Sequence, residues 1–284
     1  MRLDFTKMQG AGNDFIVVDA FARPIELTAA QWARLADRRF GIGADQILIV
    51  GPPVDPAHDF SYRIINADGG EVEHCGNGAR AFLRYVRERG LTDKAQVAVE
   101  IVGGTISLRM REDRSVEVEM GVPDFSSKAV GFDNQGLTAR DADSIPLWTV
   151  PLGDGEAVDL TVASFGNPHA VLVVDDVDHA PVGEAGPMLE NHPRFTDRVN
   201  AGFMQVLDRH AIRLRVWERG VGETLACGTG ACAAAVVGIE RGLLDSPVEI
   251  EARGGRLEVR WDGPGSQAVL SGPAEIVYTG SVEI

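Results

Sequence analysis

Apolar residues in the first part of the chain fall into short runs that alternate with polar residues or continue without a break. Runs of about six residues, bounded by Gly, Pro, Asp or Asn, are typical of β-strands. A Gly-Gly pair at 103–104 separates two of these runs, as it would in a tight hairpin. The pattern predicts strands at 15–20, 45–50, 61–66, 97–102, 105–110 and 115–120.

The apolar residues change to helical spacing at two places. The first is closed by Gly90 and has its apolar positions at Ala79, Phe82, Leu83 and Val86. The second, at 231–239, is apolar on every side, which is typical of a helix that is buried all round. We therefore expect an α/β fold of the α+β type. Each half would be a curved, mostly antiparallel sheet around one central helix.

The same four-residue motif precedes both predicted helices. Cys-Gly-x-Gly stands at 75–78 and again at 227–230, 152 residues later, in a chain that has only three cysteines. One copy could be an accident of a glycine-rich chain. Two copies at the starts of two helices ask for a common origin.

The repeat extends well beyond this motif. Residues 62–81 align with 214–233 without a gap, and 97–110 align with 248–261, including a second Gly-Gly pair. Upstream, Asn13 precedes its cysteine by 62 residues and Asn167 precedes its cysteine by 60. A spacing kept over three separated segments indicates two homologous, pseudo-symmetric domains. We expect them at 1–122 and 123–272, with a last strand at 273–284 returning to the first domain.

Cys75 and Cys227 each stand where a helix begins. The first-turn N–H groups of a helix have no partner within the helix, so they bind a carboxylate and favour a thiolate over a thiol. Pseudo-twofold symmetry would bring both cysteines to one active site in a cleft between the domains. A buried cysteine beside ordinary turn glycines is the alternative for either motif taken alone.

Two facing thiols could serve several chemistries. A redox pair usually forms a local C-x-x-C, which is absent, and a zinc site with His74 or His169 lacks a second ligand at the usual spacing. Acid–base work on opposite faces of one carbon, which inverts a stereocentre, fits two matched thiols. Pyridoxal phosphate is disfavoured because none of the three lysines, Lys7, Lys94 and Lys128, lies in a glycine-rich phosphate-binding context. We expect no cofactor and no metal.

Composition narrows the range of partners. The net charge of −15 would repel nucleic acid and anionic membranes. No apolar run has the length of a transmembrane helix or the form of a signal peptide. Three cysteines do not make a disulfide framework. We expect a cytoplasmic protein that acts on a small molecule.

Motifs along almost the whole chain resemble those of the diaminopimelate epimerase family. They stand at 7–19, 37–46, 62–82, 164–178, 200–206, 213–234 and 271–278. The resemblance implies a cofactor-independent epimerase that interconverts LL- and meso-2,6-diaminopimelate, in the synthesis of lysine and of peptidoglycan precursors. It also implies a homodimer with Tyr278 at the interface.

The resemblance further assigns roles to single residues. Cys75 and Cys227 match the acid–base pair, and His169 and Glu218 match residues that adjust the cysteine pKa values. The implied substrate contacts are Asn13, Gln46, Asn66, Gly76, Asn77, Asn167, Asn200, Glu218, Arg219, Gly228 and Thr229.

The repeat itself is broken where Asn66 aligns with Glu218 and Ala67 with Arg219. A symmetric reaction centre needs matched cysteines, whereas the rest of an asymmetric substrate needs unmatched contacts. One carboxylate and one guanidinium suit a distal ammonium and a distal carboxylate, although a surface ion pair is the alternative. A proline or hydroxyproline racemase would leave both charges unused. A non-catalytic amino-acid sensor or a thiol redox switch is the rival from another class.

Overall fold

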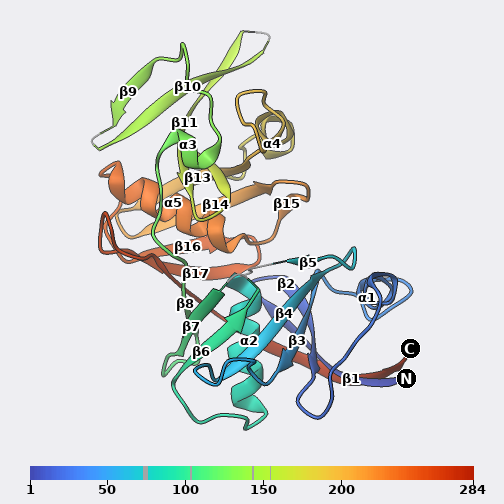
Figure 1. Cartoon of the computed structure of the whole chain (residues 1–284). Coiled ribbons are helices and arrows are strands. Elements are labelled where there is room, and N and C mark those ends of the chain that lie inside the picture. Colours follow the sequence, from blue (N-terminus) through green and yellow to red (C-terminus); the bar gives the residue numbers. More distant parts are fainter. Residues whose placement is uncertain (73–75, 103, 143, 154) are drawn as a thin grey trace. The chain divides into compact units, whose positions relative to one another are not determined.

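The computed structural model describes residues 1–72, 76–102, 104–142, 144–153 and 155–284 (Figure 1). The chain forms two compact units, each described here by itself. Unit 1 is Met1–Glu119 with Ser271–Ile284, and unit 2 is Met120–Leu270. The boundaries expected from the sequence were 122/123 and 272/273.

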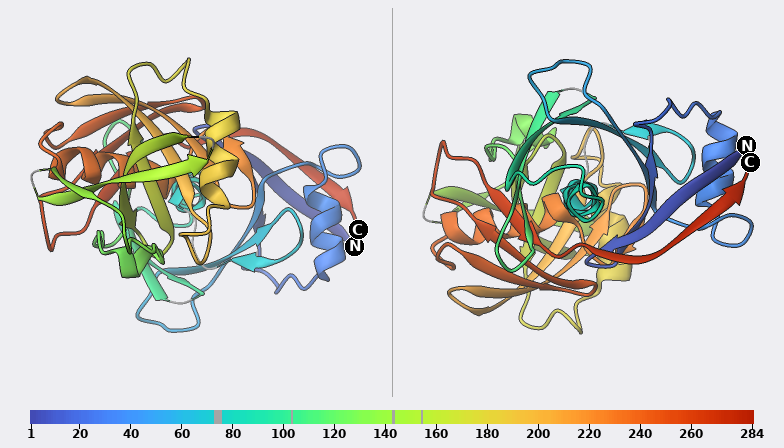
Figure 2. Two further views of the ribbon diagram at one scale, coloured as in Figure 1. Left: turned by 90° about the horizontal axis from the view of Figure 1, so that it is seen from above. Right: turned by 90° about the horizontal axis from the view of Figure 1, so that it is seen from below.

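Unit 1 is a curved sheet around one long helix. Helix α2 (Gly76–Glu88) contacts strands on several sides, and Figure 2 shows it end-on within the curve of the sheet. A shorter helix, α1 (Ala29–Ala36), lies between the second and third strands. The strands are β1 (Arg2–Gly10), β2 (Asn13–Asp19), β3 (Gln46–Gly51), β4 (Phe60–Asn66), β5 (Glu71–Val72), β6 (Gln96–Ile101), β7 (Gly104–Met110), β8 (Val116–Glu119) and β19 (Glu275–Glu283).

Unit 2 has its own central helix, α5 (Gly228–Glu240), and two more helices, α3 (Ser127–Val130) and α4 (Val182–Glu190). Its strands are β9 (Ala139–Ala142), β10 (Ile145–Gly153), β11 (Glu156–Ser164), β12 (Pro168–Val173), β13 (Asn200–Asp208), β14 (Ala211–Glu218), β15 (Gly222–Thr224), β16 (Val248–Ala252), β17 (Gly255–Arg260) and β18 (Val269–Gly272). The division between the units falls within β18.

The two units repeat one pattern of strand pairing. In unit 1, β1–β2 is antiparallel, β2–β3 parallel, β3–β4 antiparallel, β4–β6 parallel and β6–β7 antiparallel. The pairs β11–β12, β12–β13, β13–β14, β14–β16 and β16–β17 follow the same sequence of directions in unit 2. The predicted fold class, with a mostly antiparallel sheet about a central helix in each half, is confirmed.

The central helices differ in what surrounds their side chains. As the sequence predicted, α5 is buried nearly all round, because it carries small and apolar residues on every face. Helix α2 buries a similar length, yet one of its fully buried side chains is Arg80. A buried arginine needs hydrogen-bond partners, and these are described with the site.

The apolar runs predicted β2, β3, β4, β6, β7, β8 and the two central helices. They gave no range for the nine-residue strands β1, β10, β11 and β13 or for the three shorter helices. Helix α1 begins at Thr28, whose side chain accepts from the backbone N–H of Gln31 while the Gln31 side chain reaches back to the cap. This capping box is a readable sequence signal. Trp32 and Leu35 then bury the apolar side of α1.

The last strand closes the sheet of unit 1. β19 pairs antiparallel with β1 along nearly its whole length, from Arg2 opposite Glu283 to Gln9 opposite Glu275. The ring of Tyr278 on β19 meets that of Phe5 on β1 edge-on, with centroids 5.9 Å apart. Among the described residues, no helix is both long and apolar enough to cross a membrane.

Candidate active site

Cys227 is the N-cap residue of α5. Its backbone is extended, and its Sγ accepts from the backbone N–H of Gly230 at 3.4 Å. The Thr229 hydroxyl lies 3.6 Å from the same sulfur. A Cβ on Gly230 would lie 3.2 Å from Sγ and 3.1 Å from a methyl group of Val216. The second glycine of the motif therefore leaves room for the sulfur against the first turn of the helix.

Burial raises the pKa of the Cys227 thiol well above its ordinary value, and the negative charge of Glu218 raises it further. The contacts with Thr229 and Gly230 act in the opposite direction without reversing the shift. The helix terminus alone was expected to favour the thiolate. Desolvation outweighs it here because only 6 % of Cys227 is exposed. Cys227 is accordingly a thiol at neutral pH in this arrangement.

Glu218 stands at the end of β14, where the hairpin to β15 pairs it with Gly222. The hydroxyl of Thr224 on β15 donates to its carboxylate. The hairpin thus fixes a negative charge close enough to Cys227 to act on its pKa.

Asn167 links the strand side of this site to the helix side. Its amide nitrogen donates to the Thr229 hydroxyl at 3.1 Å, and its Oδ1 lies 3.1 Å from Nε2 of His169. Burial lowers the pKa of His169 to about 3, and the positive charge of Arg219 contributes. His169 is therefore neutral at pH 7, and its ring can donate from Nε2 to Asn167.

Asn200 holds the turn that carries Arg219. Its side chain donates to the carbonyl of Pro168 at 2.9 Å and accepts from the backbone N–H of Arg219 at 2.9 Å. The Arg219 guanidinium donates to the carbonyl of Asp197 at 2.8 Å. Strand register places Asn200 opposite His169, so these residues share one end of the sheet.

Unit 1 gathers a corresponding group of amides. Asn77 in the first turn of α2 donates to Oδ1 of Asn13 at 3.3 Å, and Gln46 donates to Asn66 at 2.9 Å. Register matches Phe15 with Gln46 in this unit just as it matches His169 with Asn200 in the other. Gly76 and Gly228 are both buried at the first positions of their helices. The predicted catalytic Cys75, and His74 beside it, lie outside the described residues.

Charged residues that the sequence reading did not single out surround Asn13. Its amide donates to Asp45 at 2.8 Å, and Arg38 bridges Asp45 and Asp14 at 2.8 Å to each. Burial alone would raise the pKa of Asp14, but hydrogen bonds from Arg38 and Lys7 hold it well below its ordinary value. The carboxylate of Asp14 therefore stays charged across the physiological range.

Arg80 was also missed. It is fully buried, and its guanidinium donates to Oδ1 of Asn77 at 2.9 Å and to the carbonyl of Pro273 at 3.2 Å. The sequence did hold a signal, because Arg80 aligns with Cys232 inside the matched motif regions. Where the repeat aligns a charged residue with a small apolar one, the two halves are expected to have different roles.

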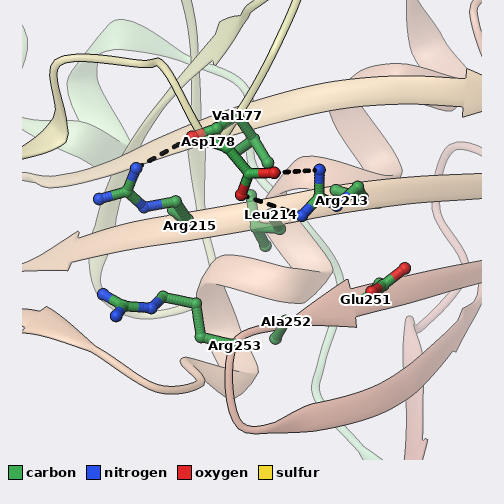
Figure 3. A pocket seen from close by; sticks show the side chains of 8 residues that line it. All are labelled: Val177, Asp178, Arg213, Leu214, Arg215, Glu251, Ala252 and Arg253. Atoms are coloured by element: carbon green, nitrogen blue, oxygen red, sulfur yellow. Dashed lines mark hydrogen bonds and ion pairs between the residues drawn. The ribbon is translucent and has the colours of Figure 1, made fainter.

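A cavity of about 390 Å³ lies elsewhere, on the outer side of the unit 2 sheet (Figure 3). None of the predicted site residues lines it. Its three arginines are paired: Arg213 with Asp178, at 2.8 and 3.0 Å, and Arg215 and Arg253 with Glu223. Within the described ranges, no group of three or more His, Cys, Asp or Glu side chains could hold a metal ion.

Comparison with known proteins adds independent findings. A family model described as diaminopimelate epimerase matches residues 5–126 and 161–277. The chain is 56 % identical over 284 residues to a diaminopimelate epimerase of Cupriavidus taiwanensis, covering 100 % of this chain and 98 % of that one. It is also 56 % identical over 290 residues to the enzyme of that name from Variovorax paradoxus, covering 100 % and 99 %.

Among solved structures, the chain is similar to a hydroxyproline epimerase from Agrobacterium vitis. The TM-score is 0.68 at 15 % identity, over 99 % of this chain and 92 % of that one. Identity at this level shows a shared fold and nothing about the substrate.

Proposed function

Since the chain belongs to the diaminopimelate epimerase family and is an isomerase of that family, we propose that it interconverts LL- and meso-2,6-diaminopimelate. One cysteine removes the α-proton from one face of the carbon, and the other returns a proton to the opposite face. The observation that carries the proposal is Cys227 at the N-terminus of α5, with Glu218 raising its pKa. No cofactor takes part in this reaction.

Cys227 suits the acid in one direction of the reaction. Its raised pKa keeps the proton on sulfur until negative charge develops on the neighbouring carbon. Cys75 would then be the thiolate that accepts the substrate proton, and the two exchange roles in the reverse direction. The first-turn N–H groups of α5 and α2 would bind the α-carboxylate and stabilise the charge that spreads onto it.

The far end of the substrate requires contacts that the repeat does not duplicate. We propose that Arg219 binds the distal carboxylate and that Glu218 faces the distal ammonium. Asn200 supports this role by holding the backbone N–H of Arg219. Cys75 and Cys227 are the proposed catalytic pair, and His169 is proposed to adjust the pKa of the thiols. The remaining proposed substrate contacts are Asn13, Gln46, Asn66, Gly76, Asn77, Asn167, Gly228 and Thr229.

A second copy of the chain is the proposed partner, in a homodimer. Three consecutive apolar side chains of β19, Ile276, Val277 and Tyr278, are 41–57 % exposed. Exposed apolar strand residues of this kind are typical of an interface. Tyr278→Ala should lower the dimer fraction in sedimentation at micromolar concentration. An unchanged dimer would remove Tyr278 from the interface. The place in lysine and peptidoglycan-precursor synthesis and the cytoplasmic location stay predictions.

Isotope exchange tests the function directly. The enzyme is incubated with LL-diaminopimelate in D₂O, and the product is analysed by mass spectrometry and chiral separation. We expect meso product carrying deuterium at the inverted α-carbon. Trans-4-hydroxyproline, the substrate of the rival racemase, should remain unlabelled. Labelled hydroxyproline with unlabelled diaminopimelate would replace the proposal by its rival, and exchange into neither would overturn catalysis altogether.

A further inference from the structure

Arg80 is a buried cation inside the central helix of unit 1. It has no exposed surface, and its guanidinium donates to Oδ1 of Asn77 and to the carbonyl of Pro273. Gly10 packs against it, since a Cβ there would lie 3.4 Å from Nη2 of Arg80 and 3.3 Å from the Pro273 oxygen. The guanidinium is therefore enclosed and held in one place.

An arginine can only donate hydrogen bonds, so it decides which end of the Asn77 amide faces it. The oxygen turns inward to Arg80, and the nitrogen turns toward Asn13, to which it donates. Asn13 in turn donates to Asp45, whose carboxylate can only accept. The row Arg80–Asn77–Asn13–Asp45 thus runs from an obligatory donor to an obligatory acceptor, and both amides have a single orientation.

In unit 2 the corresponding row of hydrogen bonds runs in the opposite direction, from the strand to the helix. Asn167, which aligns with Asn13, gives its oxygen to His169 and donates toward the helix residue Thr229. The helix position that aligns with Arg80 is Cys232, and the strand position that aligns with His169 is Phe15. Each unit has one polar side chain that sets the direction, and it comes from the helix in unit 1 and from the strand in unit 2.

We propose that Arg80 is a positioning residue that fixes the amide of Asn77 with its nitrogen turned outward, toward Asn13 and the substrate. This role rests on the proposed function, in which Asn77 is a substrate contact, and we take its partner on the substrate to be the α-carboxylate. A carboxylate accepts hydrogen bonds, so an outward-facing Asn77 oxygen would repel it. In this role Arg80 acts through Asn77.

Arg80→Lys tests the role with the charge retained. A lysine ammonium cannot span both Asn77 and Pro273 as the guanidinium does, so kcat/KM for diaminopimelate should fall about tenfold. The matched control is Arg84→Lys, one helical turn later, where the side chain pairs with Glu88 at 3.0 Å. The control should stay within about twofold of wild type.

A double-mutant cycle separates positioning from structural support. If Arg80 acts through Asn77, adding Arg80→Lys to Asn77→Ala should lower kcat/KM by less than about twofold more. Equal losses in both backgrounds would overturn the proposal.

Asn77→Asp covers the case in which Arg80→Lys fails to fold, because it gives Arg80 a carboxylate partner. Its melting temperature should not fall, while kcat/KM should drop at least about tenfold, since an oxygen then faces outward. Wild-type activity in Asn77→Asp would also overturn the proposal.

A readout that needs no activity keeps this test apart from the proposed function. The side-chain amide resonances of Asn77 are identified by their loss in Asn77→Asp. They should shift in Arg80→Lys and stay in place in Arg84→Lys. Unmoved resonances in Arg80→Lys refute the positioning role even in an active enzyme. A wild-type protein that does not epimerise diaminopimelate refutes the proposed function and leaves the resonances to decide about Arg80.

Discussion

Units 1 and 2 share the order of their strands and a central helix, but they differ in the charged groups that lie near that helix. Unit 1 has a buried cation in α2 and an ionic cluster around Asp14 and Asp45. Unit 2 has an apolar α5, with a neutral His169 and the carboxylate of Glu218 near Cys227. A duplicated scaffold can therefore keep its backbone plan while each copy takes its own electrostatic surroundings. The proposed substrate, with one reacting end and one bound end, would need such a difference.

The largest expected effect tests what the units have in common. Cys227→Ala should abolish epimerisation, because it removes one of the two proposed proton carriers, and Cys75→Ala should do the same. Deuterium incorporation into meso product measures the loss. Cys232→Ala is the matched control, since Cys232 is fully buried one turn into the same helix and should retain activity. Substantial turnover by Cys227→Ala without added thiol would contradict the two-base mechanism.

The next effect tests the position at which the repeat aligns Ala67 with Arg219. Arg219→Lys keeps the charge and loses the planar fork, so kcat/KM for diaminopimelate should fall roughly ten- to a hundredfold. An analogue that lacks the distal carboxylate should be hardly affected. Equal losses on both compounds would mean that Arg219 supports the fold or the reaction centre, and the specificity assignment would fail.

His169→Phe makes unit 2 resemble unit 1, where Phe15 holds the aligned position. His169 has a lowered pKa in the fold and an ordinary one in the unfolded chain, so its contribution to stability is present above about pH 6.5 and is lost as the pH falls. Between pH 7 and 5 that loss is about 2 kcal/mol of unfolding free energy.

Between pH 7 and pH 5, His169→Phe should lose correspondingly less unfolding free energy than the wild type, as measured by urea unfolding at both pH values. His179→Gln is the control with the opposite sign, since the hydrogen bond to Asp176 raises the pKa of that exposed histidine. An unaltered decline in His169→Phe would exclude His169 as its source.

The smallest expected effect concerns the electrostatics of the sulfur. Glu218→Gln removes a charge that raises the pKa of Cys227, so thiolate should form at lower pH and alkylation at fixed pH should be several-fold faster. Burial remains, so the pKa should stay above its ordinary value. Mass spectrometry of Cys227 modified by iodoacetamide measures the rate, with Cys232 in the same sample as internal control. Slower or equal alkylation would show that Glu218 does not act on this thiol.

Local periodicity was sufficient to predict β2, β3, β4, β6, β7, β8 and both central helices, because each depends on a sheet face or helix face that the sequence displays directly. The repeat pointed to Asn13 and Asn167, and the family resemblance pointed to Asn77 and Thr229, which the fold places beside them. Neither helical spacing nor the repeat could reveal that Arg80 is enclosed. Its cover comes from Pro273, 193 residues further along the chain.

The sequence also could not show which of two opposing influences on the pKa of a thiol is larger. The helix N-terminus at Cys227 predicted a lowered pKa and a thiolate. In the fold, burial and the nearby Glu218 raise the pKa instead. The surroundings of Asn13 show the same limit, since Arg38 and Asp45 are ordinary loop residues until the fold brings them to Asn13.

The pairing of β19 with β1 has a consequence for biosynthesis. Unit 2 is one continuous stretch, whereas unit 1 joins β1, which precedes unit 2 in the sequence, to β19, which follows it. A nascent chain emerges N-terminus first, so unit 2 has all its strands before unit 1 can close. Of the two units, the one whose synthesis begins earlier is thus completed later. Until the segment after unit 2 has emerged, β1 lacks its partner β19 and Arg80 lacks the carbonyl of Pro273.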